Sequence, residues 1–373
     1  MREMSVFELK EMLENNEPVS VVDIRLTPDY ADWYIVGSKN MPVYGDLKMG
    51  ELSDAAAQFR TLPTDRPVVA VCYRGNSSKI AVEVMEAMNI PAYNLIGGIT
   101  AWSAVWTLAR IPVNDAPHAI CYQVRRNAKG CLSYFLAVNG EATVIDPAVD
   151  EQAFLDLAKE HSCKIVAVVE THVHADHISR ARTLAQSTNA KLYLPENNRV
   201  TFGYNRVKDG DAITIGGAPL RVYATPGHTG ESVCYSWFDS LLFTGDTLFV
   251  ESVGRPDLEK GDAGAENGAK LLYDSLHSRV MNLPPDMTVC PGHTSEMIGF
   301  DGKPIVARLS ELTASIEYLK QDERSFVQSI VTSLSAKPPN FQFIIAINEG
   351  RADCAPTDPL VVEAGPNRCA VGK

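Results

Sequence analysis

The chain has 373 residues and an apolar fraction of 45%, which is typical of a globular protein with two folded units. Its net charge of −12 argues against nucleic acid or an anionic membrane surface as a partner, because both need a basic face, and no apolar run is long enough to span a bilayer. The eight cysteines show no C-x-x-C spacing and the first residues lack a signal-peptide core, so we expect free thiols and a cytoplasmic location.

The first unit is expected over residues 1–110. Apolar runs that are typical of strands alternate with helical stretches, with strands at 19–24, 67–72 and 90–96 and helices at 51–60 and 77–89. Strands that are separated by helices indicate a parallel sheet. Two prolines predict a linker at 111–118.

Cys72 stands where the second of these strands ends. A short polar loop follows it, formed by Tyr73, Arg74, Gly75, Asn76 and Ser77. Backbone N–H groups of such a loop form an anion nest, and the N-terminus of the next helix adds positive potential. Both effects stabilise a thiolate, so we predict that Cys72 is a nucleophile with a lowered pKa. The alternative is a buried core cysteine. A cysteine phosphatase is disfavoured because its arginine position is occupied by Ser78.

Three segments of this unit, VVDIR at 21–25, GSKNMP at 37–42 and IGGITAW at 96–102, resemble rhodanese signatures, and CYRGNSSK resembles the loop of single-domain thiosulfate sulfurtransferases. The resemblance covers residues 1–110 and implies an α/β domain with a parallel five-stranded sheet and flanking helices. It also implies that Cys72 accepts a sulfane sulfur from a donor such as thiosulfate, becomes a persulfide and passes the sulfur to a thiol. Many rhodaneses carry an arginine at Ser77, so Arg74 is expected to supply that charge.

The second unit is expected over 119–350, followed by a C-terminal tail or arm at 351–373. Its predicted strands lie at 120–126, 131–138, 141–146, 164–170, 191–194, 212–215, 220–225, 232–238 and 241–245, and its predicted helices at 150–160, 177–187 and 304–336. The Asn-Gly pair at 139–140 predicts a hairpin. Strand-rich segments with interspersed helices suggest two sheets that are covered by helices.

Metal-binding side chains crowd into the segment THVHADH at 171–177, directly after an apolar strand. It supplies His172, His174, Asp176 and His177, and later turns add His228, Asp246 and His293. Five of the eight histidines fall in these motifs, so independent surface histidines are a poor explanation. Imidazole and carboxylate together suit zinc or iron.

The order H-x-H-x-D-H, TPGHT, TGDTLF and PGH resembles the metallo-β-lactamase fold over residues 119–350. This resemblance implies an αββα sandwich, in which two packed sheets are flanked by helices and the site lies at one edge. The family includes dizinc hydrolases such as glyoxalase II and iron-dependent persulfide dioxygenases.

Two ligand sets follow from the resemblance. A dizinc hydrolase would hold one metal through His172, His174 and His228 and the other through Asp176, His177 and His293, with Asp246 bridging. A mononuclear iron site would use only His172, His228 and Asp246, and would leave positions open for a sulfur atom and O₂. In that case His174, Asp176, His177 and His293 orient the ligands from behind.

The segments ETHVHADH, GCLSYFL and DTLFVESVGRPD resemble the dioxygenase branch, and a fused rhodanese unit would share its persulfide. We therefore predict one Fe(II) per chain that oxidises a low-molecular-weight thiol persulfide, such as glutathione persulfide, with O₂ to sulfite. By this resemblance Arg255 holds a carboxylate of the thiol and Tyr134 lines the site, with an Arg255–Asp257 ion pair and ordinary core packing as the alternatives. A dizinc thioester hydrolase and a sulfur carrier remain as rivals. The thiol (glutathione, coenzyme A or bacillithiol), the direction of sulfur flow and a homodimeric state stay open.

Overall fold

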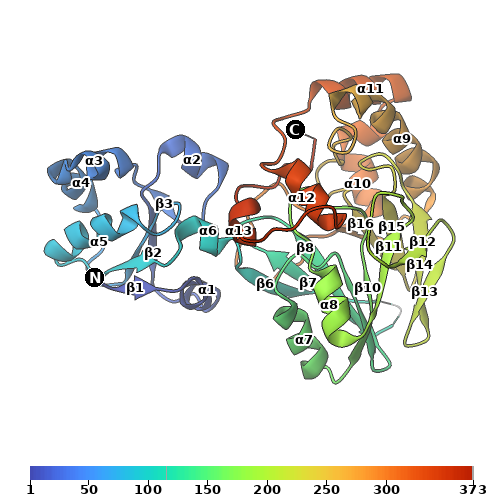
Figure 1. The fold of residues 1–373 in the computed structure, drawn as a ribbon, viewed down its shortest axis with the longest axis horizontal. Helices are drawn as coiled ribbons and strands as arrows, with labels where there is room; N and C mark the ends of the chain where they lie inside the picture. The colour runs from blue at the N-terminus through green and yellow to red at the C-terminus, as the bar shows by residue number, and fades with distance from the viewer. Residues whose placement is uncertain (115, 372–373) are drawn as a thin grey trace.

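The computed structural model describes residues 1–114 and 116–371. Figure 1 shows two units that lie side by side and meet near α6 and α13. The first unit holds a five-stranded sheet in the order β1-β5-β4-β2-β3, in which every pair is parallel. Its strands are β1 (Glu3–Met4), β2 (Ser20–Asp23), β3 (Lys39–Asn40), β4 (Val68–Val71) and β5 (Ala92–Leu95). Its helices are α1 (Val6–Glu14), α2 (Thr27–Asp32), α3 (Tyr44–Met49), α4 (Leu52–Phe59), α5 (Ser77–Ala87) and α6 (Gly98–Trp102).

The second unit contains two sheets. The seven-stranded sheet comprises β6 (Trp106–Arg110), β7 (Ile120–Arg126), β8 (Leu132–Val138), β9 (Glu141–Ile145), β10 (Lys164–Val169), β11 (Lys191–Pro195) and β12 (Asn205–Val207). The six-stranded sheet comprises β13 (Ala212–Ile215), β14 (Ala218–Ala224), β15 (Val233–Trp237), β16 (Leu241–Gly245), β17 (Thr288–Pro291) and β18 (Ala307–Arg308). The predicted hairpin joins β8 to β9, and Asn139 and Gly140 take the positive φ values of 50° and 79° that such a tight turn needs.

The two sheets pack face to face, and helices cover their outer faces. Buried side chains from both sheets, among them Tyr134, Trp237 and Phe243, form the central core. On one outer face the core includes residues of α7 (Glu151–Glu160) and α8 (Ala181–Thr188), and on the other it includes residues of α9 (Ala265–Ser278), α10 (Leu309–Ser315) and α11 (Glu323–Thr332). The predicted fold classes of both units, a rhodanese-like α/β domain and an αββα sandwich, are confirmed.

Two segments differ from their expected form. The strand β6, which the sequence places at the end of the first unit, pairs antiparallel with β7 and so extends the sheet of the second unit. The helix expected over 304–336 is broken, because Ile316 is extended and Asp322 starts a new helix by accepting a hydrogen bond from the Ser325 N–H at 2.8 Å.

The C-terminal segment is an arm that lies on the second unit as far as residue 371; residues 372–373 lie outside the described part. It contains α13 (Pro359–Val362) and follows α12 (Phe341–Asn348); both helices are drawn in red in Figure 1. Beyond α13 the arm is held by backbone hydrogen bonds from Arg255 N–H to the Cys369 carbonyl (2.9 Å) and from Val371 N–H to the Val253 carbonyl (3.0 Å).

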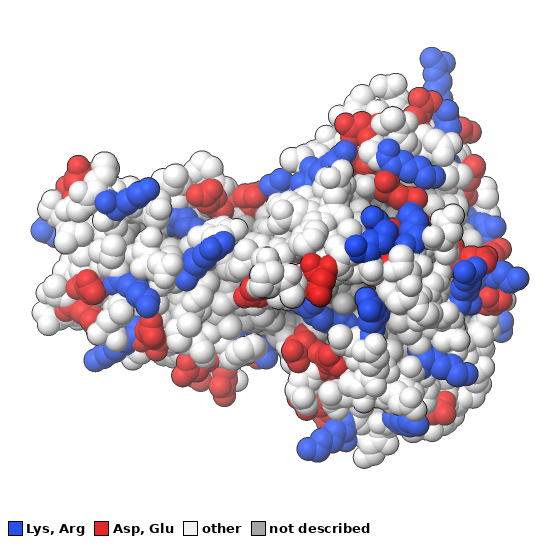
Figure 2. Space-filling model, viewed as in Figure 1, with Lys and Arg blue, Asp and Glu red and all other residues white. Residues whose placement is uncertain are grey.

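The two units contact each other through the turn between β7 and β8. Ala128 in this turn is buried in one apolar cluster with Trp33 and Trp102 of the first unit. Figure 2 shows that acidic and basic side chains are interspersed on both units. Within the described residues, the structure contains no helix of the length and apolarity that crossing a membrane requires.

Candidate metal centre

The predicted metal-binding residues come together at one edge of the sandwich, because each follows a strand. The segment 171–177 follows β10, Asp246 follows β16 and His293 follows β17, while His228 lies in the loop between β14 and β15. All seven side chains are buried: His172, His174, Asp176, His177, His228, Asp246 and His293. The structure thus brings all seven predicted residues together at one edge of the sandwich.

Three atoms in this cluster are directed at one point. Asp246 Oδ2 lies 3.8 Å from His172 Nε2 and 3.5 Å from His228 Nε2. Each of the three atoms is buried and has no hydrogen-bond partner among the described residues. Ligands at about 2.0–2.2 Å from a tetrahedral or octahedral ion lie at comparable separations, so these three residues fit a metal.

The opposite side of each of these groups is fixed by a neighbour. His172 Nδ1 lies 2.9 Å from Thr171 Oγ1, His228 Nδ1 lies 2.7 Å from the Arg255 carbonyl, and Asp246 Oδ1 lies 2.5 Å from His293 Nδ1. Such partners orient an imidazole so that Nε2 faces the ion. Burial, helped by His174, lowers the pKa of His172 well below its usual value, which keeps the ring in the neutral form that binds metal.

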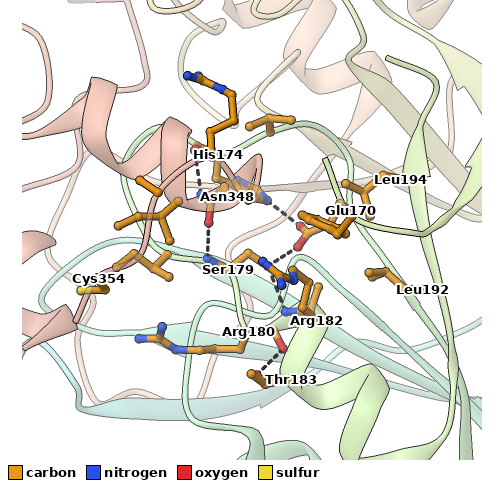
Figure 3. A pocket seen from close by; sticks show the side chains of 18 of the residues that line it. Glu170, His174, Ser179, Arg180, Arg182, Thr183, Leu192, Leu194, Asn348 and Cys354 are labelled. Atoms are coloured by element: carbon orange, nitrogen blue, oxygen red, sulfur yellow. Dashed lines mark hydrogen bonds and ion pairs between the residues drawn. The ribbon is translucent and has the colours of Figure 1, made fainter. Parts of the chain in front are cut away.

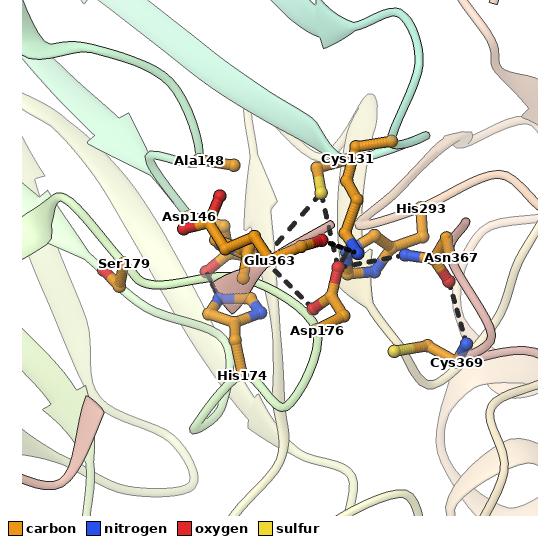
Figure 4. A network of polar contacts seen from close by, with 12 residues as sticks. Cys131, Asp146, Ala148, His174, Asp176, Ser179, His293, Glu363, Asn367 and Cys369 are labelled. Atoms are coloured by element: carbon orange, nitrogen blue, oxygen red, sulfur yellow. Dashed lines mark hydrogen bonds and ion pairs between the residues drawn. The ribbon is translucent and has the colours of Figure 1, made fainter. Parts of the chain in front are cut away.

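His174 is held away from this point. Its Nε2 lies 2.9 Å from Glu170 Oε2 and 3.3 Å from Asp146 Oδ1. Burial alone would lower the pKa of His174, but the two carboxylates outweigh it and raise that pKa well above its usual value. Figure 4 shows His174 beside Asp146. Glu170 and Asp146 were not predicted, although they directly follow β10 and β9 next to the predicted site.

The remaining predicted residues form a second cluster, in which Asp176 is central. Its carboxylate lies 2.9 Å from His293 Nε2 and 3.0 Å from His177 Nδ1, and accepts hydrogen bonds from Cys131 Sγ at 3.3 Å and Asn367 Nδ2 at 3.0 Å. Figure 4 shows Asp176 between these groups. Cys131 and Asn367 were not predicted, since they come from the β7–β8 turn and the C-terminal arm. Four of these groups also offer ligand atoms to an ion: Cys131, Asp176, His177 and His293.

Arg255 is placed differently from its expected role. Its side chain is 1% exposed, and its guanidinium is bound to Asp257 at 2.7 and 3.0 Å. The other donors reach the backbone carbonyls of Ser335, Ala336 and Arg368. No donor is left for a substrate carboxylate, so Arg255 fastens loops together while its own carbonyl holds His228.

Tyr134 also has a structural position. Its hydroxyl donates a hydrogen bond to the Pro291 carbonyl at 2.6 Å, and its ring packs edge-on against Phe243 in the core between the sheets. Burial raises the pKa of Tyr134 well above its usual value. Tyr134 thus supports the strand that leads to His293.

In the first unit, Cys72 directly follows β4 and α5 begins at Ser77, close to the predicted strand end and helix start. The thiol is 4% exposed, whereas Tyr73, Arg74 and Asn76 are exposed around it. Ser78 occupies the position where a cysteine phosphatase would have its arginine, and no role was predicted for it. Its Oγ lies 3.2 Å from Cys72 Sγ and 2.6 Å from Asn94 Oδ1. Gly75 takes φ 76°, which lets the loop curve around the sulfur.

Comparison with known families agrees with this architecture. Residues 126–293 match the metallo-beta-lactamase superfamily and residues 5–105 match the rhodanese-like domain. The probable polyketide biosynthesis zinc-dependent hydrolase BaeB of Bacillus velezensis is 30% identical over 192 residues, which are 50% of this chain and 80% of that protein. The chain belongs to the metallo-beta-lactamase superfamily and carries a rhodanese-like domain.

Within this superfamily the chain is similar to persulfide dioxygenases. The human protein, persulfide dioxygenase ETHE1, mitochondrial, is 35% identical over 159 residues, which are 41% of this chain. The chain spans 59% of the length of that relative. The crystal structure of ETHE1 from Myxococcus xanthus is 28% identical with a TM-score of 0.54, and the match covers 62% of this chain and 98% of that one.

Proposed function

We propose that the second unit is an iron-dependent dioxygenase of low-molecular-weight thiol persulfides and that the first unit transfers sulfane sulfur through Cys72. The similarity to persulfide dioxygenases and the presence of a rhodanese-like domain support a role in sulfur metabolism. The ligands of the proposed Fe(II) are His172, His228 and Asp246, a set of two histidines and one carboxylate that is typical of non-haem iron oxygenases.

The observation that carries this proposal is the contrast between His172 and His174. A dizinc hydrolase of this fold would need His174 as a third nitrogen ligand beside His172 and His228. Here His172, His228 and Asp246 each bring a ligand atom within 4.8 Å of the other two, whereas the group that contains His174 is formed with Asp146 and Glu170. The geometry thus favours a mononuclear site.

Bound Fe(II) would offer a position for the persulfide sulfur and pass electrons to O₂. Zinc could bind the sulfur but could not pass electrons, because it has no redox chemistry. In the overall reaction a persulfide, O₂ and water give a thiol and sulfite. The residues of the chain fix the ligand geometry from behind: Thr171 at His172, the Arg255 carbonyl at His228, and His293 at Asp246. The buried setting of all three ligands limits access of bulk water.

In the first unit, Cys72 Sγ would attack the outer sulfur of thiosulfate and release sulfite. A thiol would then take the sulfur from the Cys72 persulfide and become the substrate or product that both units share. Exposed Arg74 stands beside the buried thiol, where it can attract the anionic donor. Because both sites belong to one chain and the two units are in contact, a persulfide released at one site is at a raised local concentration near the other.

Oxygen uptake on addition of glutathione persulfide, measured beside elemental analysis of the purified protein, tests the proposal. We expect one iron per chain and O₂ consumption with release of sulfite. The Cys72→Ser variant should keep this uptake and lose thiosulfate sulfurtransferase activity. A protein that holds iron and consumes no O₂ with this substrate would reject the dioxygenase.

A dizinc thioester hydrolase with an attached sulfurtransferase is the second candidate. It is favoured by the cluster of Cys131, Asp176, His177 and His293, whose ligand atoms lie within 4.8 Å of one another. Two zinc ions per chain and cleavage of a glutathione thioester would support this candidate instead.

A further inference from the structure

A cavity of about 660 Å³ opens beside the metal centre, between α8, β11 and the end of α12 (Figure 3). His172 and His174 form part of its wall. Apolar side chains cover another part, namely Ile178, Leu192, Leu194, Phe202 and Ile347. Its volume is within the range of about 300–1,000 Å³ of small-molecule sites. The cavity is therefore large enough for a thiol of peptide or nucleotide size.

The cavity is positively charged in a protein whose net charge is −12. It is lined by three arginines, Arg180, Arg182 and Arg351, and by two acids, Glu170 and Asp353. Glu170 is already engaged, because it accepts hydrogen bonds from His174 Nε2 and the Ser179 hydroxyl. An anion that enters the cavity thus meets more positive than negative charge.

Of the arginines, Arg182 has the least compensated charge. Its guanidinium carbon lies 4.2 Å from the centre of the Phe202 ring. Among the described residues, Arg182 contacts this ring and forms no ion pair with a carboxylate. Arg180 is 3.4 Å from Glu363, and Arg351 donates to Glu349 at 2.6 Å. Arg182 and Arg351 are both exposed, so each can turn towards a ligand.

Asn348, three residues before Arg351, fixes the position of this part of the chain relative to the metal centre. Asn348 Nδ2 donates to the carbonyls of His174 (2.9 Å) and His177 (2.8 Å), and its Oδ1 accepts from Ser179 N–H at 2.9 Å. The end of α12 is thereby fastened to the loop that carries His172. Arg351 also lines a smaller cavity of about 110 Å³ that reaches His228.

We propose that this cavity recognises the charged end of the thiol substrate, with Arg182 and Arg351 as its specificity-determining residues. The substrate class is a low-molecular-weight thiol that carries at least two negative charges remote from its sulfur. Its sulfur lies towards His172 and its carboxylates or phosphates lie at the arginines. The orientation of the bound thiol, with its sulfur towards His172, rests on the proposed function.

Binding of an unreactive thioether tests the site without turnover. S-methylglutathione supplies carboxylates and S-methyl coenzyme A supplies phosphates, and the diethyl ester of S-methylglutathione serves as the control that lacks both carboxylates. We expect the metal-loaded protein to bind at least one of the two anionic probes, as measured by calorimetry, and to bind the ester more weakly. Arg182→Gln and Arg351→Gln should each lower the affinity for the anionic probe about tenfold, the loss expected for one charge-assisted hydrogen bond.

Arg206→Gln is the matched control, because Arg206 is exposed on β12, pairs with Glu196 and lies outside the cavity. The inference is overturned if neither anionic probe binds at millimolar concentration, if the ester binds as tightly as the acid, or if the two cavity variants bind like the Arg206 control. Persulfide-dependent O₂ uptake separates this result from the proposed function. Arginine-dependent binding without any uptake would retain the site and reject the dioxygenase, whereas uptake with an unchanged kcat/KM in both variants would reject the site alone.

Discussion

Trp33 of the rhodanese-like unit donates its indole N–H to the backbone carbonyl of Ala128 at 2.6 Å. Ala128 stands in the turn between β7 and β8, three residues before Cys131, which donates to Asp176 beside the metal centre. On the other side, the ring of Trp33 meets that of Tyr73, the neighbour of Cys72, at a centroid distance of 6.2 Å. This turn therefore links the neighbourhoods of the two sites.

Replacement of Trp33 by Phe should weaken the contact of the two units. The substitution leaves a buried carbonyl unpaired, which costs about 1–3 kcal/mol. We expect faster proteolysis at residues 103–105, where the chain passes from α6 of the first unit to β6 of the second, and an earlier unfolding transition for the first unit in urea. Sulfurtransferase activity measured with thiosulfate should persist, since Cys72 keeps its loop. Identical proteolysis of variant and parent would show that the hydrogen bond contributes nothing to the interface.

The two kinds of histidine at the centre should differ in metal retention. His172→Ala removes a proposed ligand and should leave the purified protein with little iron. His174→Gln removes only a residue that Glu170 and Asp146 hold behind the site, so the loss of affinity should stay within about 10–100-fold, the usual cost of an orienting residue. Elemental analysis after dialysis against a graded series of chelator concentrations measures both. An equal loss in the two variants would support the dizinc ligand set.

The sequence predicts the metal centre well because its residues follow strands in short motifs. Parallel and mixed sheets gather strand ends at an edge, so His172, His228 and Asp246 converge without any knowledge of loop conformation. The same logic predicts the position of Cys72 at the end of β4. The alternative to substrate binding was a surface ion pair between Arg255 and Asp257; the structure contains this pair, but both side chains are buried.

What the sequence could not provide are partners from distant segments. Asn348, Glu363 and Asn367 reach the metal loop across more than 150 residues, with separations of 174, 185 and 191. Glu363 and Asn367 lie in the segment 351–373, whose low periodicity predicted a tail, and Asn348 lies just before it in α12. The strand β6 was not predicted for a related reason, since its pairing with β7 depends on tertiary contacts that alternation alone does not specify.

Glu363→Gln should destabilise the protein in a pH-dependent manner. Burial would raise the pKa of Glu363, but Arg126 (2.6 Å) and Arg180 (3.4 Å) outweigh it and lower that pKa below its ordinary value. A lowered folded-state pKa means that the stabilisation is present above the unfolded value of about 4.3 and is lost as the pH falls through the folded value.

For this variant we expect a loss of about 3–5 kcal/mol in the free energy of unfolding at pH 7, the usual cost of breaking a buried ion pair. The difference between variant and parent should shrink as the pH falls below about 4. Urea denaturation at a series of pH values measures it, provided that the metal content is matched. A difference that stays constant down to the acid transition would mean that charge does not account for the effect.

Ser78 should assist sulfur transfer, whereas its neighbour Ser77 should not. The Ser78 hydroxyl lies 3.2 Å from Cys72 Sγ and 2.6 Å from Asn94 Oδ1, and its single hydrogen can turn from the amide oxygen to a thiolate or persulfide sulfur. Ser78→Ala should lower kcat for thiosulfate sulfurtransfer by about tenfold, as expected from one lost hydrogen bond to a charged group. Ser77→Ala is the matched control. Alkylation rates of Cys72 against pH should shift in the Ser78 variant only; equal profiles would make Ser78 a packing residue.

Gly98→Ala should disrupt the Cys72 loop, although Gly98 lies at the start of α6 and is separated from Cys72 in the chain by α5 and β5. A Cβ at Gly98 would stand 2.8 Å from Gly75 N and 2.9 Å from Arg74 N and would also collide with the Cys72 carbonyl, and Gly98 has a φ of 58°. Backbone atoms cannot yield as a flexible side chain does, so the loop must open and the nest of N–H groups around the sulfur must widen. Sulfurtransferase activity should fall at least tenfold while persulfide-dependent O₂ uptake continues. Gly45→Ala, where an added Cβ meets no atom within 4 Å, should retain both activities. Full transferase activity in Gly98→Ala would mean that the curvature of this loop does not determine the reactivity of Cys72.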